Sequence, residues 1–265
     1  MNIFLKEMKS HRKSLVFWSI GIFLMVASGM IKYESLASSG QSMNDMLAGM
    51  PKSMLAILGM ADFDISNATG YYGLLFIYLL LMATIHAAML GATIIGKEER
   101  DKTTEFLFVK PVSRNNIIAA KLAAAFFNII ILNLVTFISS LILVGKYSKD
   151  EVVTGDITIT MGGMFILQVL FMVIGSSLAA FKRKSKTAAY LATGILLLTY
   201  VISVAIDLNE SLEGLKYLTP FKYFEAKNVM FGGGFEFIFV LLSGVLIAAL
   251  TAATFAFYKK RDLNV

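Results

Sequence analysis

Residues 71–96 read YYGLLFIYLLLMATIHAAMLGATIIG, a run without a single Asp, Glu, Lys or Arg. A helix needs about 20 apolar residues to cross the roughly 30 Å of hydrocarbon in a bilayer. This stretch is therefore predicted to be a membrane-spanning helix, and its length and polarity are the standard against which the rest of the chain is compared.

Five further stretches of the 265-residue chain are similarly long and apolar, and their only charged residues are Lys121 near the start of the third span and Glu236 at the edge of the sixth. Together they predict an all-α, polytopic membrane protein with six transmembrane helices, forming one domain over 1–265. The predicted spans are 14–31, 71–96, 117–145, 159–181, 187–206 and 236–258. The composition agrees, because only 16% of the residues are charged, against about 25% in a soluble domain.

The basic residues between the spans predict the orientation of the chain. Of the 24 Lys and Arg residues, 17 lie in one alternating set of segments and 7 in the other. The positive-inside rule places the richer set, which includes both termini, in the cytoplasm. Because these residues lie at the ends of apolar runs, the net charge of +6 does not indicate a nucleic-acid partner.

Two segments outside the spans are predicted to have structure of their own. In residues 1–13, one helical face carries Ile3, Phe4 and Met8, and the rest carries Lys6, Glu7, Lys9 and Arg12. This pattern predicts a short helix lying in the cytoplasmic interface. A solvated basic tail is the alternative. Segment 207–235 contains Pro220 and is predicted to form external re-entrant or short helices.

The cytoplasmic connection between the second and third spans is longer than a hairpin requires. Residues 96–114 read GKEERDKTTEFLFVKPVSR. Charged residues fill the first half and apolar residues the second, which predicts a helix over 97–114 with one end buried. Pro111 is expected to stop this helix, and Ser113 to cap the next one. A merely amphipathic surface helix is the alternative interpretation.

Two groups of residues resemble the ABC-2 type transporter permease family. The first group, in and after this connection, is Glu98, Glu99, Thr103, Glu105, Leu107, Pro111, Ser113, Arg114 and Lys121. The second lies in LKYLTPFKYF, residues 215–224, and comprises Pro220, Phe221, Tyr223 and Phe224. Lys102 stands where the family usually has Gly, and Thr219 where it usually has Ser.

The resemblance implies that segment 97–114 is a coupling helix that docks on a separate ATPase subunit. The contacts it implies are Glu98, Glu99, Arg100, Glu105 and Phe106. It further implies two ATPase copies that carry the ATP and Mg²⁺, and a second permease copy or a similar permease. The expected activity is export of an amphipathic peptide or a drug across a bacterial cytoplasmic membrane.

No catalytic residue, cofactor or metal site is predicted in this chain. Residues 91–97, GATIIGK, fit part of a phosphate-binding loop, but Glu98 follows where Ser or Thr would hold Mg²⁺. The segment also closes a predicted membrane helix, whereas a phosphate-binding loop follows a strand. The chain has no Cys and only two His, which excludes thiolate and imidazole-rich metal sites.

Four residues with an amide or imidazole side chain lie within the predicted spans: His86, Asn128, Asn133 and Gln168. Such residues either form hydrogen bonds between helices or line a transport pathway. Hydrogen bonding between helices is the favoured interpretation for the three amides. For His86 the two interpretations are balanced.

Two other kinds of transporter are weighed against the leading interpretation. An ion-coupled secondary transporter would need acidic residues within the spans, which are lacking there. A copper-linked permease is suggested by the methionine row Met43, Met46, Met50 and Met54, because thioethers bind Cu(I). An amphipathic helix on the outer leaflet explains that row better.

Overall fold

The computed structural model describes residues 2–38, 49–60, 63–100, 112–148, 153–182 and 185–260. Over these ranges the regular structure is helical and contains no strand. Six helices are long and apolar enough to cross a membrane. They are α1 (Ile3–Ser38), α4 (Ala68–Arg100), α6 (Arg114–Tyr147), α7 (Thr154–Phe181), α8 (Ser185–Leu208) and α10 (Phe237–Lys259). The all-α, six-helix prediction is confirmed, and each predicted span coincides with one of these helices.

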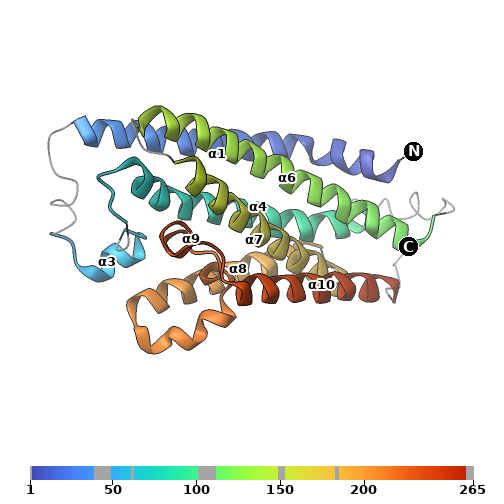
Figure 1. The fold of residues 1–265 in the computed structure, drawn as a ribbon. Coiled ribbons are helices and arrows are strands. Elements are labelled where there is room, and N and C mark those ends of the chain that lie inside the picture. Colours follow the sequence, from blue (N-terminus) through green and yellow to red (C-terminus); the bar gives the residue numbers. More distant parts are fainter. Residues whose placement is uncertain are drawn as a thin grey trace.

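The helices run roughly along one axis, with α4 and α7 at the centre of the bundle (Figure 1). In the most apolar stretch of each helix, 67% of the residues of α4 and of α7 are buried, against 17% for α10. An outer helix such as α10 therefore presents most of its apolar surface outward, as expected where lipid or another subunit covers it.

Small residues bring α4 and α7 into close contact. A Cβ added at Gly91 of α4 would lie 2.0 Å from the carbonyl oxygen of Met172 in α7. A Cβ added at Gly175 would lie 2.3 Å from the carbonyl oxygen of Ala88. Only glycine allows the two backbones to approach this closely, which is a common way for membrane helices to pack.

The first helix differs from the prediction. The sequence pattern predicted a separate interfacial helix over 1–13, whereas α1 continues without a break from Ile3 to Ser38. The reason is tertiary: Phe4 and Met8 pack on the bundle core, and Glu7 is buried. The N-terminal turns are therefore part of the bundle.

Four short helices lie at the end of the bundle away from the termini (Figure 1). They are α3 (Lys52–Ile57), the 3₁₀ helices η1 (Glu210–Leu218) and η2 (Pro220–Lys222), and α9 (Ala226–Phe231). The last three lie within 207–235, the segment expected to form external re-entrant or short helices. We call residues 210–231 the cap.

The predicted coupling helix lies mostly outside the described residues. Helix α4 runs on to Arg100, and the chain is described again from Val112, one residue before Ser113, the N-cap residue of α6. Of the residues singled out above, Thr103, Glu105, Phe106, Leu107 and Pro111 lie outside the described residues, as do Met43 and Met46.

Candidate functional site

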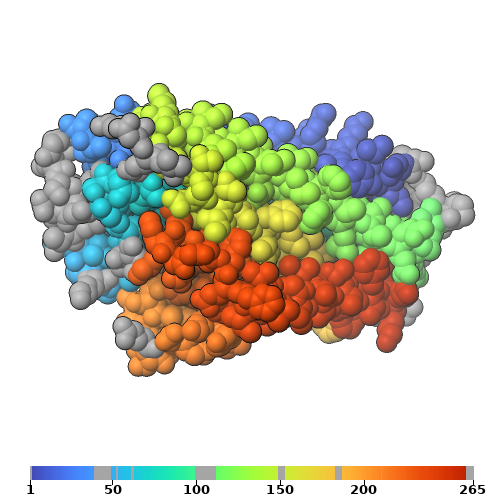
Figure 2. All heavy atoms as spheres, viewed as in Figure 1, coloured from blue at the N-terminus to red at the C-terminus, as the bar shows by residue number. Residues whose placement is uncertain are grey.

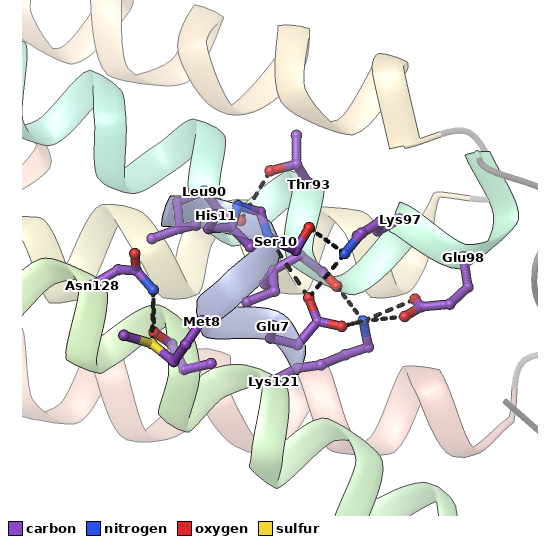
Figure 3. A network of polar contacts seen from close by, with 12 residues as sticks. Glu7, Met8, Ser10, His11, Leu90, Thr93, Lys97, Glu98, Lys121 and Asn128 are labelled. Atoms are coloured by element: carbon purple, nitrogen blue, oxygen red, sulfur yellow. Dashed lines mark hydrogen bonds and ion pairs between the residues drawn. The ribbon is translucent and has the colours of Figure 1, made fainter. Parts of the chain in front are cut away.

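Three helices meet where the chain enters and leaves the 97–114 connection. Lys121, near the start of α6, is wholly buried there. Its Nζ donates to both carboxylate oxygens of Glu98 at 2.8 Å and to the carbonyl oxygen of Ile94 at 2.7 Å, both in α4. It also donates to Oε1 of Glu7 in α1 at 3.2 Å (Figure 3). One ammonium group therefore joins α1, α4 and α6.

A second lysine completes the charge balance. Nζ of Lys97 lies 3.5 Å from Oε2 of Glu7, and Nε2 of His11 lies 3.7 Å from the same oxygen. We call Glu7, Lys97, Glu98 and Lys121 the Lys121 cluster. Its two carboxylates and two ammonium groups cancel formally, and burying charges is tolerable only when they are paired in this way.

The structure corrects the role expected for Glu98. The resemblance implied that this carboxylate touches an ATPase subunit on the surface, but Glu98 is only 6% exposed and faces Lys121. The turn of α4 that carries it is pressed against α1 and α6, so the side chain points into the bundle. Glu99 and Arg100 follow as the last two residues of α4.

Sequence reasoning missed Glu7. The residue was placed on the polar face of an N-terminal helix, yet it is 1% exposed. One signal was present: Glu7 is the only acidic residue among several basic ones at the start of the chain. A lone carboxylate in such a segment indicates a specific partner, although not which lysine supplies it.

The start of α6 is fixed by two further contacts. Oγ of Ser113 accepts a hydrogen bond from the backbone N–H of Asn116 at 3.2 Å, which confirms the predicted helix cap. Nη1 of Arg114 donates to the carbonyl oxygen of Lys259 at the end of α10, at 3.0 Å. A cation at a helix C-terminus is favourable, and Figure 2 shows the start of α6 against the end of α10.

The three predicted amides make hydrogen bonds between helices. Nδ2 of Asn133 in α6 donates to Oε1 of Gln168 in α7 at 3.1 Å. Nδ2 of Asn128 donates to the Met8 sulfur of α1 at 3.1 Å, as well as to the carbonyl oxygen of Ala124 in its own helix. These contacts agree with the interpretation favoured for the amides, hydrogen bonding between helices, since a polar group in hydrocarbon needs a partner.

The fourth polar residue, His86, is different. It is 3% exposed, its ring lies 5.5 Å from that of Trp18 in α1, and its Nδ1 has no hydrogen-bond partner among the described residues. His86 lines a hollow between α1 and α4.

The second group of family-like residues packs the cap at the other end of the bundle. Oγ1 of Thr219 is buried and donates to the carbonyl oxygen of Thr199 in α8 at 2.7 Å. The ring of Tyr223 stacks on Phe239 of α10 with a centroid distance of 4.8 Å. Phe221 and Phe224 are buried and make ring contacts with Phe171 and Phe235. These residues hold the cap on three spans, and Pro220 within the cap is buried as well.

The arrangement is suited to mechanical linkage. Residues 91–97, which resemble part of a phosphate-binding loop, lie in the interior of α4 and are helical throughout. Among the described residues, no group of three or more His, Cys, Asp or Glu side chains is placed to hold a metal ion. What the Lys121 cluster does is bind the last turns of α4 to α1 and α6.

One known family matches nearly the whole chain. The family model described as "ABC-2 family transporter protein" matches residues 1–263. No curated protein matches the chain. The family match spans both the Lys121 cluster and the cap.

Proposed function

Because the chain belongs to the ABC-2 family of transporter proteins, we propose that it is the permease subunit of an ATP-driven exporter whose ATPase is a separate chain. The plain consequence of family membership is that this multi-pass membrane protein is the transmembrane subunit of an ABC transporter. The direction of transport, the substrate and the docking of the ATPase are the proposal.

The Lys121 cluster is the observation that carries the proposal. Glu98 lies three residues before the described part of α4 gives way to the 101–111 stretch, where the ATPase is proposed to dock. Any displacement of that stretch must pull on the last turn of α4. Through Lys121, the displacement reaches α6 and α1 in the same step.

The energetics favour movement of the three helix ends as one body. Removing one partner of a buried ion pair costs about 3–5 kcal/mol, because the other charge is left uncompensated. Sliding α4 away from Lys121 would incur a cost of that kind. A push from the cytoplasm is therefore transmitted through the cluster more easily than it breaks the cluster.

The proposed assembly contains two permeases and two ATPase subunits that hold ATP and Mg²⁺. The proposed membrane is a bacterial cell membrane with the Lys121 cluster on its cytoplasmic side, and the loop charges support this orientation. The proposed cargo is an amphipathic peptide or a drug. Met54 on α3, which is 49% exposed at the cap end, supports this class of cargo because methionine adapts to varied apolar surfaces.

The test separates docking from transmission. The tagged chain is purified from its native membranes, and copurified chains are sequenced by mass spectrometry and assayed for ATP hydrolysis. Glu99→Lys combined with Glu105→Lys is expected to reduce copurification of the ATPase. Glu98→Gln is expected to keep copurification but to abolish the coupling of ATP hydrolysis to transport.

The matched control is Glu213→Gln, which removes a carboxylate at the cap end, where its partner Lys216 is a surface residue. This variant is expected to behave as the unaltered protein. Absence of any copurifying ATPase would overturn the proposal. Normal coupling of ATP hydrolysis to transport in Glu98→Gln would show that the Lys121 cluster has no part in the coupling.

A further inference from the structure

A groove separates α1 from α4 at the end of the bundle that carries the Lys121 cluster. Its cavity has a volume of about 260 Å³ and is lined by four residues of α1, from Ser10 to Trp18, and five residues of α4, from His86 to Lys97. The proposed transport function uses neither the cavity nor the deeper of these residues.

The groove is elongated. At one end Nζ of Lys97 donates to Oγ of Ser10, and at the other the rings of His86 and Trp18 lie 5.5 Å apart. Lys97 and His86 are eleven residues apart on one helix, which at 1.5 Å per residue corresponds to roughly 16 Å. The space between them is long enough for a short stretch of an extended chain.

The mouth of the groove is basic. A shallower hollow of about 540 Å³ shares Ser10 and Lys97 with the first cavity and adds Lys6 and Lys9. Among the residues that the structure describes, no carboxylate lines either hollow. The nearby carboxylate of Glu7 lies 3.5 Å from Lys97, but it belongs to the Lys121 cluster, where Lys121 also binds it.

The deep end contains a polar atom that needs a partner. Nδ1 of His86 is buried and has no hydrogen-bond partner among the described residues. A buried polar group in that state is destabilising. Water admitted through the basic mouth would supply the hydrogen bond that this nitrogen needs.

The outer face of α1 beside the groove is suited to lipid. Phe17 is 74% exposed, and Leu24, two turns further into the span, is 58% exposed. The loop charges place the mouth of the groove at the cytoplasmic face of the membrane. Anionic lipids are concentrated in that leaflet, and basic pockets between membrane helices on that side bind their head groups.

We propose that this groove binds one anionic phospholipid of the cytoplasmic leaflet. The phosphate lies between Lys6, Lys9 and Lys97, and an acyl chain follows the groove toward Trp18. The occupant follows from charge complementarity at the mouth and from the exposed apolar outer face of α1. The inference rests on the orientation of the chain, and it does not require any particular exported substrate.

Trp18 is the only tryptophan of the chain and lies at the deep end of the groove, so it reports on the occupant directly. The full-length protein is reconstituted in phosphatidylcholine vesicles that contain a minor fraction of brominated lipid. That lipid is either phosphatidylglycerol or phosphatidylcholine, and bromine quenches tryptophan fluorescence on contact. We expect stronger quenching by the brominated phosphatidylglycerol.

The variant is Lys6→Gln combined with Lys9→Gln, which leaves the Lys121 cluster untouched. The attraction of one surface lysine for anionic lipid corresponds to an enrichment of about fivefold. The double variant is therefore expected to lower the preference for phosphatidylglycerol by at least about fivefold. The matched control, Lys13→Gln, removes an exposed basic residue of α1 outside both hollows and is expected to keep the preference.

Three results would overturn the inference. The first is equal quenching by the two brominated lipids, as expected if a second protein copy covers the groove. The second is an equal loss of preference in Lys13→Gln, which would indicate only general surface charge. The third is loss of the preference on addition of inorganic phosphate but not of chloride at the same ionic strength, which would indicate a site for free phosphate. Circular dichroism of each variant checks that the helices are intact.

Discussion

Two lysines, at opposite ends of the bundle, each lie between two carboxylates. Lys121 is wholly buried and binds Glu7 and Glu98, which come from two other helices. Lys222 of the cap binds Asp207 at the end of α8 and Glu225 three residues further on. Side-chain exposure is 9% for Lys222, 28% for Asp207 and 24% for Glu225.

The same chemistry therefore has different consequences in the two places. The partners of Lys121 are 23 and 114 residues away, so its ion pairs fix three spans to one another. The partners of Lys222 are 15 and 3 residues away, so its ion pairs fix a local fold. Solvent also reaches the carboxylates of Asp207 and Glu225 and weakens their attraction to Lys222, whereas the Lys121 cluster has little access to water.

The largest expected effect is that of Lys121→Met. The change leaves Glu7 and Glu98 buried without their shared partner, and breaking a buried ion pair in this way costs about 3–5 kcal/mol. The free energy of unfolding is measured by denaturant titration in mixed micelles. Lys222→Met is the matched comparison. An equal loss of unfolding free energy in the two variants would contradict the expected difference between the ion pairs of Lys121 and those of Lys222.

A smaller effect is expected from the neutral contact that holds the cap. Thr219→Val removes the hydroxyl that donates to Thr199 and should lower the free energy of unfolding by about 1 kcal/mol. Thr219→Ser keeps the hydroxyl and should cost less than Thr219→Val. If the two variants were equally destabilised, packing of the methyl group would matter more than the hydrogen bond.

The third effect, that of Lys222→Met at neutral pH, is expected to be at most about 1 kcal/mol, since its carboxylates remain partly solvated. Burial lowers the pKa of Lys222, but Glu225 and Asp207 outweigh it and raise the pKa above the ordinary 10.5. A lysine whose pKa is raised in the folded state stabilises the fold at pH values below its unfolded-state pKa. That contribution is lost as the pH rises through the folded-state pKa.

The measurement is the stability difference between the unaltered protein and Lys222→Met as a function of pH. The difference is expected to be constant across neutral pH and to shrink only above about 10.5. A difference that disappeared below pH 9 would indicate that Lys222 does not keep its charge through these ion pairs.

The smallest effect is expected at the pair of Lys216 and Glu213 in the same cap, whose side chains are 33% and 68% exposed. Solvated pairs of this kind contribute little to stability. Lys216→Ala should leave the unfolding transition unchanged within error. A clear loss would indicate that exposure is a poor guide to the strength of ion pairs in this protein.

Sequence reasoning went furthest where the signal is local. The span 71–96 needed only an uninterrupted apolar run, and Ser113 needed only its place before a helix. It failed for Glu7, because an acidic residue in a basic segment gives no indication of what lies against it. It also placed Glu98 on a docking surface, since the resemblance describes a segment and not the direction of each side chain.

The amino-acid sequence by itself determined that the chain crosses a membrane six times, and the loop charges predict which end faces the cytoplasm. Apolar length and charge are additive properties of short segments, so they can be read without knowing the fold. Only the tertiary structure decided that Lys121, Glu98 and Glu7 share one site. The cost of burying a charge depends on what surrounds it, and here the neighbours come from three helices far apart in the chain.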